Sequence, residues 1–317
     1  MTSSTPSVFN PAAVSNTPTP HRARRRAPRN LRLTLPRVVR SEFVKLRSVR
    51  STWMGLLLTI VIELGTTIPV VRALWTHGLE GDGKGVDLDL VSALRHPQLA
   101  GAPSVGWTLA VIAVIVVASL YGASEYTCST AYSTYQAVPR RSYVVLAKTI
   151  CLAVAVTISA LLLQAVTMVA VQFTIGGSFS ELFGADSHVI WITCVTTAIS
   201  MAMVAIVTML VATLTRSTVI PISVTVVLMY IINPLLQSLA RSYSWLDKIQ
   251  SWMLDRVQVA LTIPFAPQNS QAGISAGEGL SAGSQALTGW WLVLATALWV
   301  VVPLVITLLS IEKRDVI

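Results

Sequence analysis

The sequence predicts an all-α membrane protein with six transmembrane helices. Of its 317 residues, 53% are hydrophobic and only 12% are charged, and the mean hydropathy is +0.67. The apolar residues gather in stretches close to the roughly 20 residues that a helix needs to cross a hydrocarbon core. These stretches do not alternate apolar and polar residues as barrel strands do, so we expect helices, which satisfy their own backbone polar groups in lipid. The predicted spans are 53–71, 107–123, 149–175, 188–214, 218–239 and 289–311.

The basic residues set the predicted orientation of these spans. Seventeen Lys and Arg residues fall before the first span, in the loops after the second and fourth spans, or in the C-terminal tail 312–317, whereas the opposite side has six. By the positive-inside rule, both termini are expected in the cytoplasm of a multi-pass cell-membrane protein. The opposite side carries nine of the fourteen acids. The positive excess therefore lies inside, which favours anionic lipid over nucleic acid as its partner.

Two segments precede the first span. Residues 1–35 are rich in Ser, Thr, Pro and Arg, which predicts a disordered basic cytoplasmic tail. Residues 36–52 place Val39, Phe43 and Leu46 at helical spacing among basic residues, which predicts an amphipathic interfacial helix on the inner leaflet. A plain basic flank of the span is the alternative. The residues expected to contact the inner leaflet are Arg37, Arg40, Lys45, Arg47 and Arg50.

The outer loops differ in character. The first, 72–106, contains Gly, Asp and Pro throughout and is expected to be irregular. The last, 241–288, begins with apolar residues at helical spacing, which predicts an interfacial or re-entrant helix in its first half. Just before it, Asn233-Pro234 is expected to break the fifth span, because proline lacks a backbone donor and crowds the preceding turn. Both residues are candidates for a translocation path, and a simple kink is the alternative.

No catalytic or metal site is predicted, and the chain is expected not to be an enzyme. The four His and three Cys residues match no ligand spacing and no nucleophile arrangement. Residues 78–84 spell most of a phosphate-binding loop, but Gly85 stands where Ser or Thr must hold Mg²⁺, and no strand precedes it. Any nucleotide energy is therefore expected to come from another chain.

Glu63 lies midway through the first predicted span. An ionised carboxylate at that depth costs about 2.5–3.5 kcal/mol on insertion scales, so the group is expected to face the interior of the bundle, to be protonated, or to touch a water-filled path. There it either lines a translocation path or hydrogen-bonds as a structural group to Thr or Tyr of other helices. A proton relay would need a second acid or His deep in another span, and none is present.

The loop 125–148 after the second span is the most informative segment. The preceding helix is expected to run a turn into the cytoplasm before Pro139 reverses the chain. The two arginines that follow can then meet the acidic rim of a partner or lipid phosphates. An ordinary basic inside loop is the alternative. The residues of the predicted coupling site are Glu125, Tyr126, Pro139, Arg140, Arg141 and Lys148.

The order of these residues resembles the loop after the second span in ABC-2 type permeases. In that family the loop holds a short coupling helix that docks on an ATPase subunit. The segment 41–53 is similar to the elbow helix of bacterial members, and 311–315 is similar to the family's closing charged turn. The resemblance implies an elbow helix over 36–52, a six-span domain over 53–311 and a coupling helix within 125–148.

The resemblance also implies a function. The chain would be a permease subunit that pairs with a second copy or a related permease, and separate ATPase subunits would bind ATP and Mg²⁺ beneath it. The substrate, which the sequence does not name, would be exported. Two other functions stay open: a proton-coupled secondary transporter that uses Glu63, and a non-transporting membrane scaffold or sensor that recruits partners through its basic tail.

Overall fold

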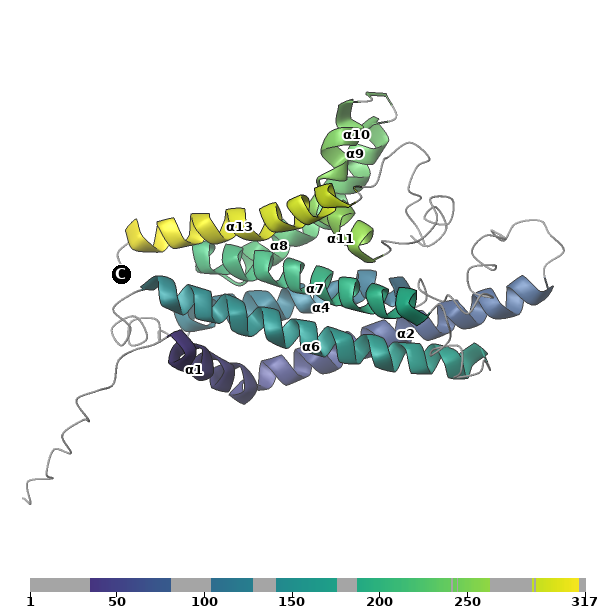
Figure 1. Cartoon of the computed structure of the whole chain (residues 1–317), viewed down its shortest axis with the longest axis horizontal. Helices are drawn as coiled ribbons and strands as arrows, with labels where there is room; N and C mark the ends of the chain where they lie inside the picture. Colours follow the sequence, from purple (N-terminus) through teal and green to yellow (C-terminus); the bar gives the residue numbers. More distant parts are fainter. Residues whose placement is uncertain are drawn as a thin grey trace, which may run out of the picture. The chain divides into compact units, whose positions relative to one another are not determined.

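The computed structural model contains helices and no strand in the residues that it describes, so the predicted all-α class is confirmed for this part of the chain (Figure 1). The predicted tail, the central part of the predicted coupling loop, the second half of the last outer loop and the C-terminal end lie outside the described residues. The described residues are 35–80, 104–127, 141–175, 187–240, 242–243, 245–262, 287 and 289–313.

Six helices are long and apolar enough to cross a membrane, which confirms the six predicted spans and makes the chain a multi-pass membrane protein by helix length and composition. The third span begins at Ser142, seven residues before the predicted 149, because the residues after Arg141 are also mostly apolar. The helices are α2 (Arg50–Glu80), α4 (Ser104–Thr127), α6 (Arg141–Ile175), α7 (Ser187–Thr215), the broken helix α8 (Val219–Val227), η3 (Leu228–Ile232) and α9 (Asn233–Ala240), and α13 (Trp290–Lys313).

The predicted break in the fifth span is present. A π-helix, η3, lies directly before Asn233 and Pro234, where the proline cannot donate a backbone hydrogen bond to the preceding turn. After the break, α9 turns away from the line of α8 and lies beside α10 (Trp245–Ser251) (Figure 1). A second short helix, α11 (Leu254–Thr262), packs against α7. The first half of the last loop is therefore helical, and its place at a membrane surface stays a prediction.

Four helices pack as a closed ring. The helix α2 packs against α4 and α6, and α7 packs against the same two helices. The helix α7 is the most enclosed of the six, since residues 201–210 are buried around its whole circumference. The outer sides of α7 also receive α8, α11 and α13. The interior of the ring is therefore shielded from lipid on every side by another helix.

Glycines allow close approach within this ring. A Cβ atom on Gly106 of α4 would lie 2.5 Å from the backbone oxygen of Glu63 and 2.4 Å from Oγ1 of Thr67, both on α2. A Cβ atom on Gly122 would lie 2.8 Å from the backbone oxygen of Met209 on α7. Small residues at such contacts are typical of membrane helices, where packing rather than the hydrophobic effect holds helices together.

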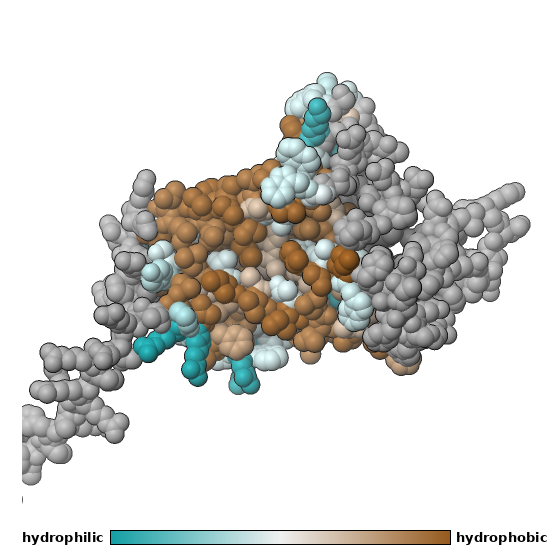
Figure 2. Space-filling view, viewed as in Figure 1, coloured by the Kyte–Doolittle hydropathy of each residue, from teal (hydrophilic) through white to brown (hydrophobic). Residues whose placement is uncertain are grey.

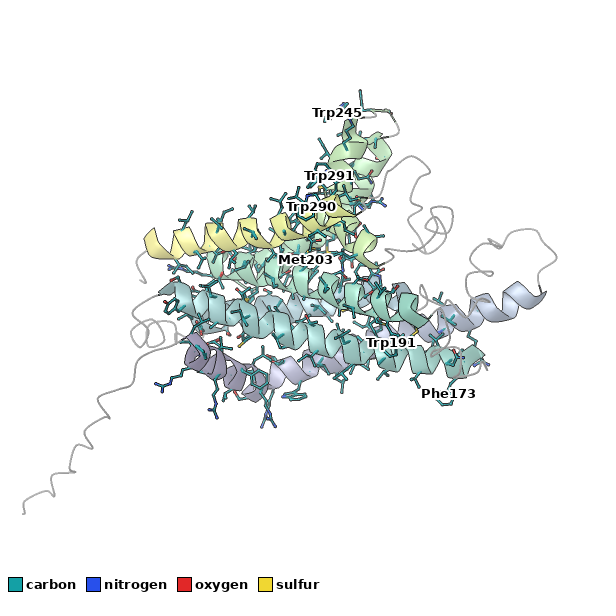
Figure 3. The ribbon with its side chains drawn as sticks, viewed as in Figure 1. Phe173, Trp191, Met203, Trp245, Trp290 and Trp291 are labelled. Carbon is teal, nitrogen blue, oxygen red and sulfur yellow. The ribbon has the colours of Figure 1, made fainter. Side chains whose placement is uncertain are left out.

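The outward faces of the helices are strongly apolar, as the space-filling view shows (Figure 2). Large aromatic side chains stand near the ends of the spans, where Trp is typical of the boundary between lipid and water. Phe173 is near the end of α6, Trp191 near the start of α7, and Trp290 and Trp291 open α13, whereas Met203 is buried at the centre of α7 (Figure 3). These residues match a bundle surrounded by a bilayer.

The helix before the first span, α1 (Leu35–Ser48), packs against α6 and α2. Its buried face consists of Val38, Glu42 and Leu46, and Val38 contacts the apolar start of α6. The predicted lipid-facing stripe therefore differs from the structure at Leu46, which is buried in the bundle. Phe43 is 49% exposed and keeps the predicted outward position.

Candidate functional site: a buried charge cluster

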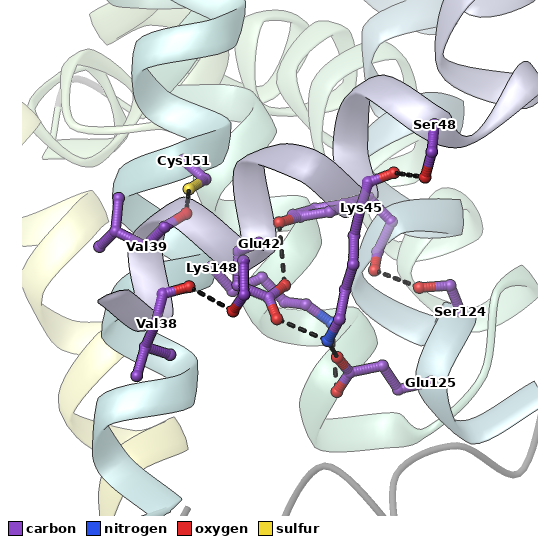
Figure 4. A network of polar contacts seen from close by, with 11 residues as sticks. Val38, Val39, Glu42, Lys45, Ser48, Ser124, Glu125, Lys148 and Cys151 are labelled. Atoms are coloured by element: carbon purple, nitrogen blue, oxygen red, sulfur yellow. Dashed lines mark hydrogen bonds and ion pairs between the residues drawn. The ribbon is translucent and has the colours of Figure 1, made fainter. Parts of the chain in front are cut away.

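Buried charges gather where α1, α4 and α6 meet, and they include two of the predicted coupling residues (Figure 4). Glu125 comes from the last turn of α4 and Lys148 from the early part of α6. Glu42 and Lys45 come from α1, and Tyr121 lies one turn before Glu125. These five residues are called the charge cluster.

Lys45 bridges the two carboxylates of the charge cluster. Its Nζ atom lies 2.6 Å from Oε1 of Glu42 and 3.0 Å from Oε1 of Glu125. Burial alone would lower the pKa of the Lys45 amine, but its hydrogen bond to Glu42 and the nearby charge of Glu125 outweigh burial and raise the pKa from its usual value. The Lys45 amine therefore holds the two acids together.

Lys148 balances the charges. Its Nζ atom lies 3.5 Å from Oε2 of Glu125 and 5.1 Å from the centre of the Tyr121 ring, which is a cation–π distance. The Tyr121 hydroxyl donates to Oε2 of Glu42 at 3.3 Å. Two carboxylates thus face two amines. Such balance is required because an uncompensated charge at a buried position costs several kcal/mol.

A further contact joins α1 to α6. The thiol of Cys151 donates to the backbone oxygen of Val39 at 3.1 Å, and Val38 packs against Val144 and Ala147 (Figure 4). Ion pairs therefore join α4 to both α1 and α6, and apolar packing joins α1 to α6. Displacement of the end of α4 or the start of α6 must move α1 or break an ion pair.

The remaining predicted coupling residues have different surroundings. The guanidinium carbon of Arg216 lies 5.6 Å from the centre of the Tyr126 ring. Arg216 follows α7 with a φ of 52°, in the turn that leads to α8, so this contact links the ends of α4 and α7. Arg141 is the first residue of α6, and Pro139 and Arg140 lie outside the described residues.

Four of the five residues predicted to contact the inner leaflet are exposed, namely Arg37, Arg40, Arg47 and Arg50. Their contact with lipid stays a prediction. Lys45 differs, because its amine lies between Glu42 and Glu125 and is used within the protein. Its position on the same helix face as Glu42, three residues away, explains this difference.

Asn233 joins the broken fifth helix to the short helices after it. Its side chain is fully buried, and its Nδ2 atom donates to Oδ2 of Asp255 at 2.5 Å. Its Oδ1 atom accepts hydrogen bonds from Gln250 and Arg256, each at 3.3 Å. These contacts hold α10 and α11 against the start of α9. Pro234 follows it and is half-buried.

Glu63 lies elsewhere, within the ring of four helices. It is fully buried on α2, and its carboxylate makes no hydrogen bond with the part of the chain that the structure describes. Asn233 faces α10 and α11, so the structure does not join the path candidates Glu63 and Asn233 in one site. Among the predicted site residues, the structure does bring Glu125 into contact with Lys148 and Lys45.

Sequence reasoning missed two members of the charge cluster, Glu42 and Tyr121. Glu42 offered a signal, because it is the one acid before the first span and stands three residues from Lys45. Tyr121 offered none, since its partner Glu42 is 79 residues away and only helix packing brings the two together.

No family model matches this sequence, and no curated protein matches it. The function is therefore inferred from the residues themselves and from their geometry.

Proposed function

We propose that this chain is the permease subunit of an ABC-2 type exporter. The six spans would form one half of a translocation path, and a second copy or a related permease would form the other half. Separate ATPase subunits would bind ATP and Mg²⁺. The observation that carries the proposal is the charge cluster, because it ties Glu125 and Lys148, on either side of the proposed docking segment, to the helix before the first span.

The charge cluster offers a physical route from a docked ATPase to the bundle. The segment between α4 and α6 follows Glu125 and precedes Lys148, so a force on that segment acts on both partners of one ion pair. The helix α1 follows through Lys45. Since α4 and α6 are both members of the four-helix ring, their displacement changes the packing of α2 and α7. ATP binding would then favour one of two arrangements of the bundle, which is alternating access.

The proposal places both termini and α1 on the cytoplasmic side of a cell membrane. The excess of basic residues on this side supports that orientation. The exposed arginines of α1 would contact phosphates of the inner leaflet. Export follows from the family preference that the resemblance implies, and the substrate is not assigned.

The first experiment tests docking. Replacing Arg140 and Arg141 together by Glu should weaken co-purification with the ATPase subunit, since favourable charges at the rim of an interface become repulsive. Arg24 and Arg25 replaced by Glu make a matched control with the same change in net charge. Equal co-purification of both variants would contradict the proposed docking role.

The second experiment tests coupling. Glu125→Gln removes the charge that holds Lys45 and Lys148 at nearly constant volume, so the complex should assemble while ATP hydrolysis no longer responds to substrate. Hydrolysis is measured with and without substrate, together with the stoichiometry of the purified complex. Normal stimulation in a correctly assembled variant would remove the charge cluster from the coupling route.

One observation favours a second candidate function. Glu63 is a fully buried carboxylate without a hydrogen bond among the described residues, as a group that exchanges a proton during transport could be. A proton-coupled secondary transporter would move its substrate in proteoliposomes under a pH gradient without any ATPase. The proposed exporter would not move its substrate under a pH gradient without the ATPase.

A further inference from the structure

Arg216 lies in the short turn between α7 and α8, in a backbone conformation that an arginine rarely adopts. Its φ of 52° falls in the left-handed region, and glycine is the usual residue at such a position directly after a helix. Strained backbone positions of this kind gather at functional sites, where the surrounding contacts hold them. The backbone therefore gives no reason for an arginine here, and the reason has to come from its guanidinium group.

The contact with Tyr126 supplies such a reason. The guanidinium carbon of Arg216 lies 5.6 Å from the centre of the Tyr126 ring, which is within cation–π range, although Arg216 itself is exposed. Tyr126 directly follows Glu125 in the last turn of α4. Arg216 therefore contacts the helix end that leads into the proposed docking segment.

The same turn is joined to α4 at two further positions. The hydroxyl of Ser119, a fully buried residue, donates to the backbone oxygen of Thr218 at 2.6 Å, and Thr218 directly precedes α8. Between Ser119 and Tyr126, Gly122 allows α4 to approach α7, because a Cβ atom there would lie 2.7 Å from Cβ of Ala212. The C-terminal part of α4 is therefore joined both to the end of α7 and to the start of the fifth span.

The fifth span also contacts α4 farther along its length. The helix α8 packs against α4, and the hydroxyl of Tyr230, in the π-helix η3, donates to the backbone oxygen of Thr108 near the start of α4. Hydrogen bonds thus join α4 to the fifth span both before and after α8. A displacement of α4 has direct contacts through which it can move the broken fifth span.

We propose that Arg216 is a positioning residue that transmits movement of the docking segment to the fifth span through Tyr126. The inference rests on the proposed function and adds a second route to it. The charge cluster connects Glu125 to α1 and α6, whereas Arg216 connects the next residue of α4 to α7 and α8. One exposed cation–π contact corresponds to a factor of about two to five in an equilibrium constant, which sets the size of the expected effect.

Hydrogen exchange of the permease–ATPase complex in nanodiscs tests the inference without any transported substrate. Exchange of backbone amides is measured without nucleotide and again after the ATPase subunit is trapped with ADP and vanadate. Two segments report the response: 142–148 at the start of α6, and 215–220, which contains the turn and the first residues of α8. Trapping should change the exchange of both segments in the unchanged chain. In Arg216→Gly the change in 142–148 should persist, and the change in 215–220 should shrink by about two- to fivefold.

Arg216→Gly separates transmission from folding. Glycine adopts a φ of 52° without strain, so the midpoint of thermal unfolding should stay close to that of the unchanged chain. Tyr126→Leu removes the other partner of the contact and should reproduce the effect of Arg216→Gly. Tyr126→Phe keeps the aromatic ring and should restore the response. Arg24→Gly removes the same charge from the N-terminal segment and is the matched control.

The outcomes distinguish this inference from the proposed function. The inference is overturned, and the exporter proposal stands, if trapping changes 142–148 but Arg216→Gly and Tyr126→Leu respond at 215–220 as the unchanged chain does. A response lost equally in Tyr126→Phe and Tyr126→Leu would also overturn it, because only the first of these keeps the ring. If trapping changes neither segment in the unchanged chain, the docking segment transmits no movement, and the proposed coupling fails together with this inference.

Discussion

Individual side chains of the charge cluster explain how charged residues can be buried beside a membrane span. Lys148 has a side chain only 4% exposed, and Glu125 one that is 7% exposed, yet each carries a formal charge. Their burial is tolerated because every charge has a partner within the cluster. The same arrangement makes the protein sensitive to substitution of any one of these residues, because removal of one charge leaves the opposite charge without full compensation.

Lys148→Met should therefore lower the free energy of unfolding by about 3–5 kcal/mol, the usual cost of breaking a buried ion pair from one side. The double variant Lys148→Met with Glu125→Met should recover much of this loss, because it removes both charges of that pair. Thermal unfolding in detergent measures both. A double variant no more stable than the single one would show that the ion pair is not the source of the loss.

Asn233 is another single side chain on which several contacts depend, at the break in the fifth helix. Asn233→Ala removes the hydrogen bonds to Gln250, Asp255 and Arg256 and should destabilise the junction of α9 with α10 and α11 by about 1–3 kcal/mol. Hydrogen exchange of backbone amides in α10 and α11 should become faster. Ser238→Ala is the control, because the Ser238 hydroxyl bonds only within its own helix, to Leu235. Unchanged exchange in Asn233→Ala would show that this joint does not hold the short helices.

Among the helices, α4 would have the central mechanical role in the proposed exporter. It packs against α2 on one side and α7 on the other, and its last turn carries Glu125. Gly106 and Gly122 set how closely it approaches these neighbours. Gly106 packs closely against α2 at one end of α4, and Glu125 forms ion pairs at the other end. A change at Glu125 would therefore reach the interior of the ring through α4.

Gly106→Ala should destabilise the protein by about 1–3 kcal/mol, because the new methyl group would overlap backbone and side-chain atoms of α2. Gly65→Ala is a matched control on α2. A Cβ atom there meets nothing within 4 Å, and alanine favours helix, so its stability should be unchanged or slightly higher. The midpoint of thermal unfolding separates the two variants. Equal midpoints would mean that α4 has room to shift.

For the whole molecule, the distribution of basic residues over the two ends of the bundle is the main guide to orientation. The charge cluster, the exposed arginines of α1 and the Arg216 turn belong to the segments for which the sequence predicts the side with seventeen basic residues. Phe173, Trp191 and Trp290 lie near the opposite ends of their helices. The proposed orientation, which rests on the basic residues, would leave the charge cluster on the cytoplasmic side.

Reporter fusions test this orientation. Fusions after Arg216 and after Arg314 should report a cytoplasmic position, and fusions at Gly273 or Gly283 should report the outside. The measurement is paired activity of an enzyme reporter that works only outside and a fluorescent reporter that works only inside. An outside result at Arg314 would require an odd number of spans.

The sequence predicts features with a local cause better than those that depend on packing. The six spans follow from the length of apolar stretches, and the break before Asn233 follows from Pro234, so both are found correctly. The inward face of α1 depends on where α6 lies, and no local pattern distinguishes Leu46, which is buried, from Phe43, which is exposed.

The candidate sites show the same division. Glu125 and Lys148 were selected from the order of residues around one loop, whereas their contact with Lys45 arises from a helix far away in the sequence. Glu63 was noted as a lone acid in the first span. Its complete burial depends on the packing of α2 against α4 and α6, which hydropathy does not contain.

The long sequence separation within the charge cluster has a consequence for biosynthesis. Lys45 and Glu125 are 80 residues apart, so at about 5–20 residues per second the ribosome makes Lys45 roughly 4–16 seconds before its partner. During that interval Lys45 can pair only with Glu42 among the acids of the charge cluster. Glu125 and then Lys148 arrive with the second and third spans. The charge cluster therefore closes only when three spans have been inserted, and its ion pairs fasten α1 as the last step of that stage of assembly.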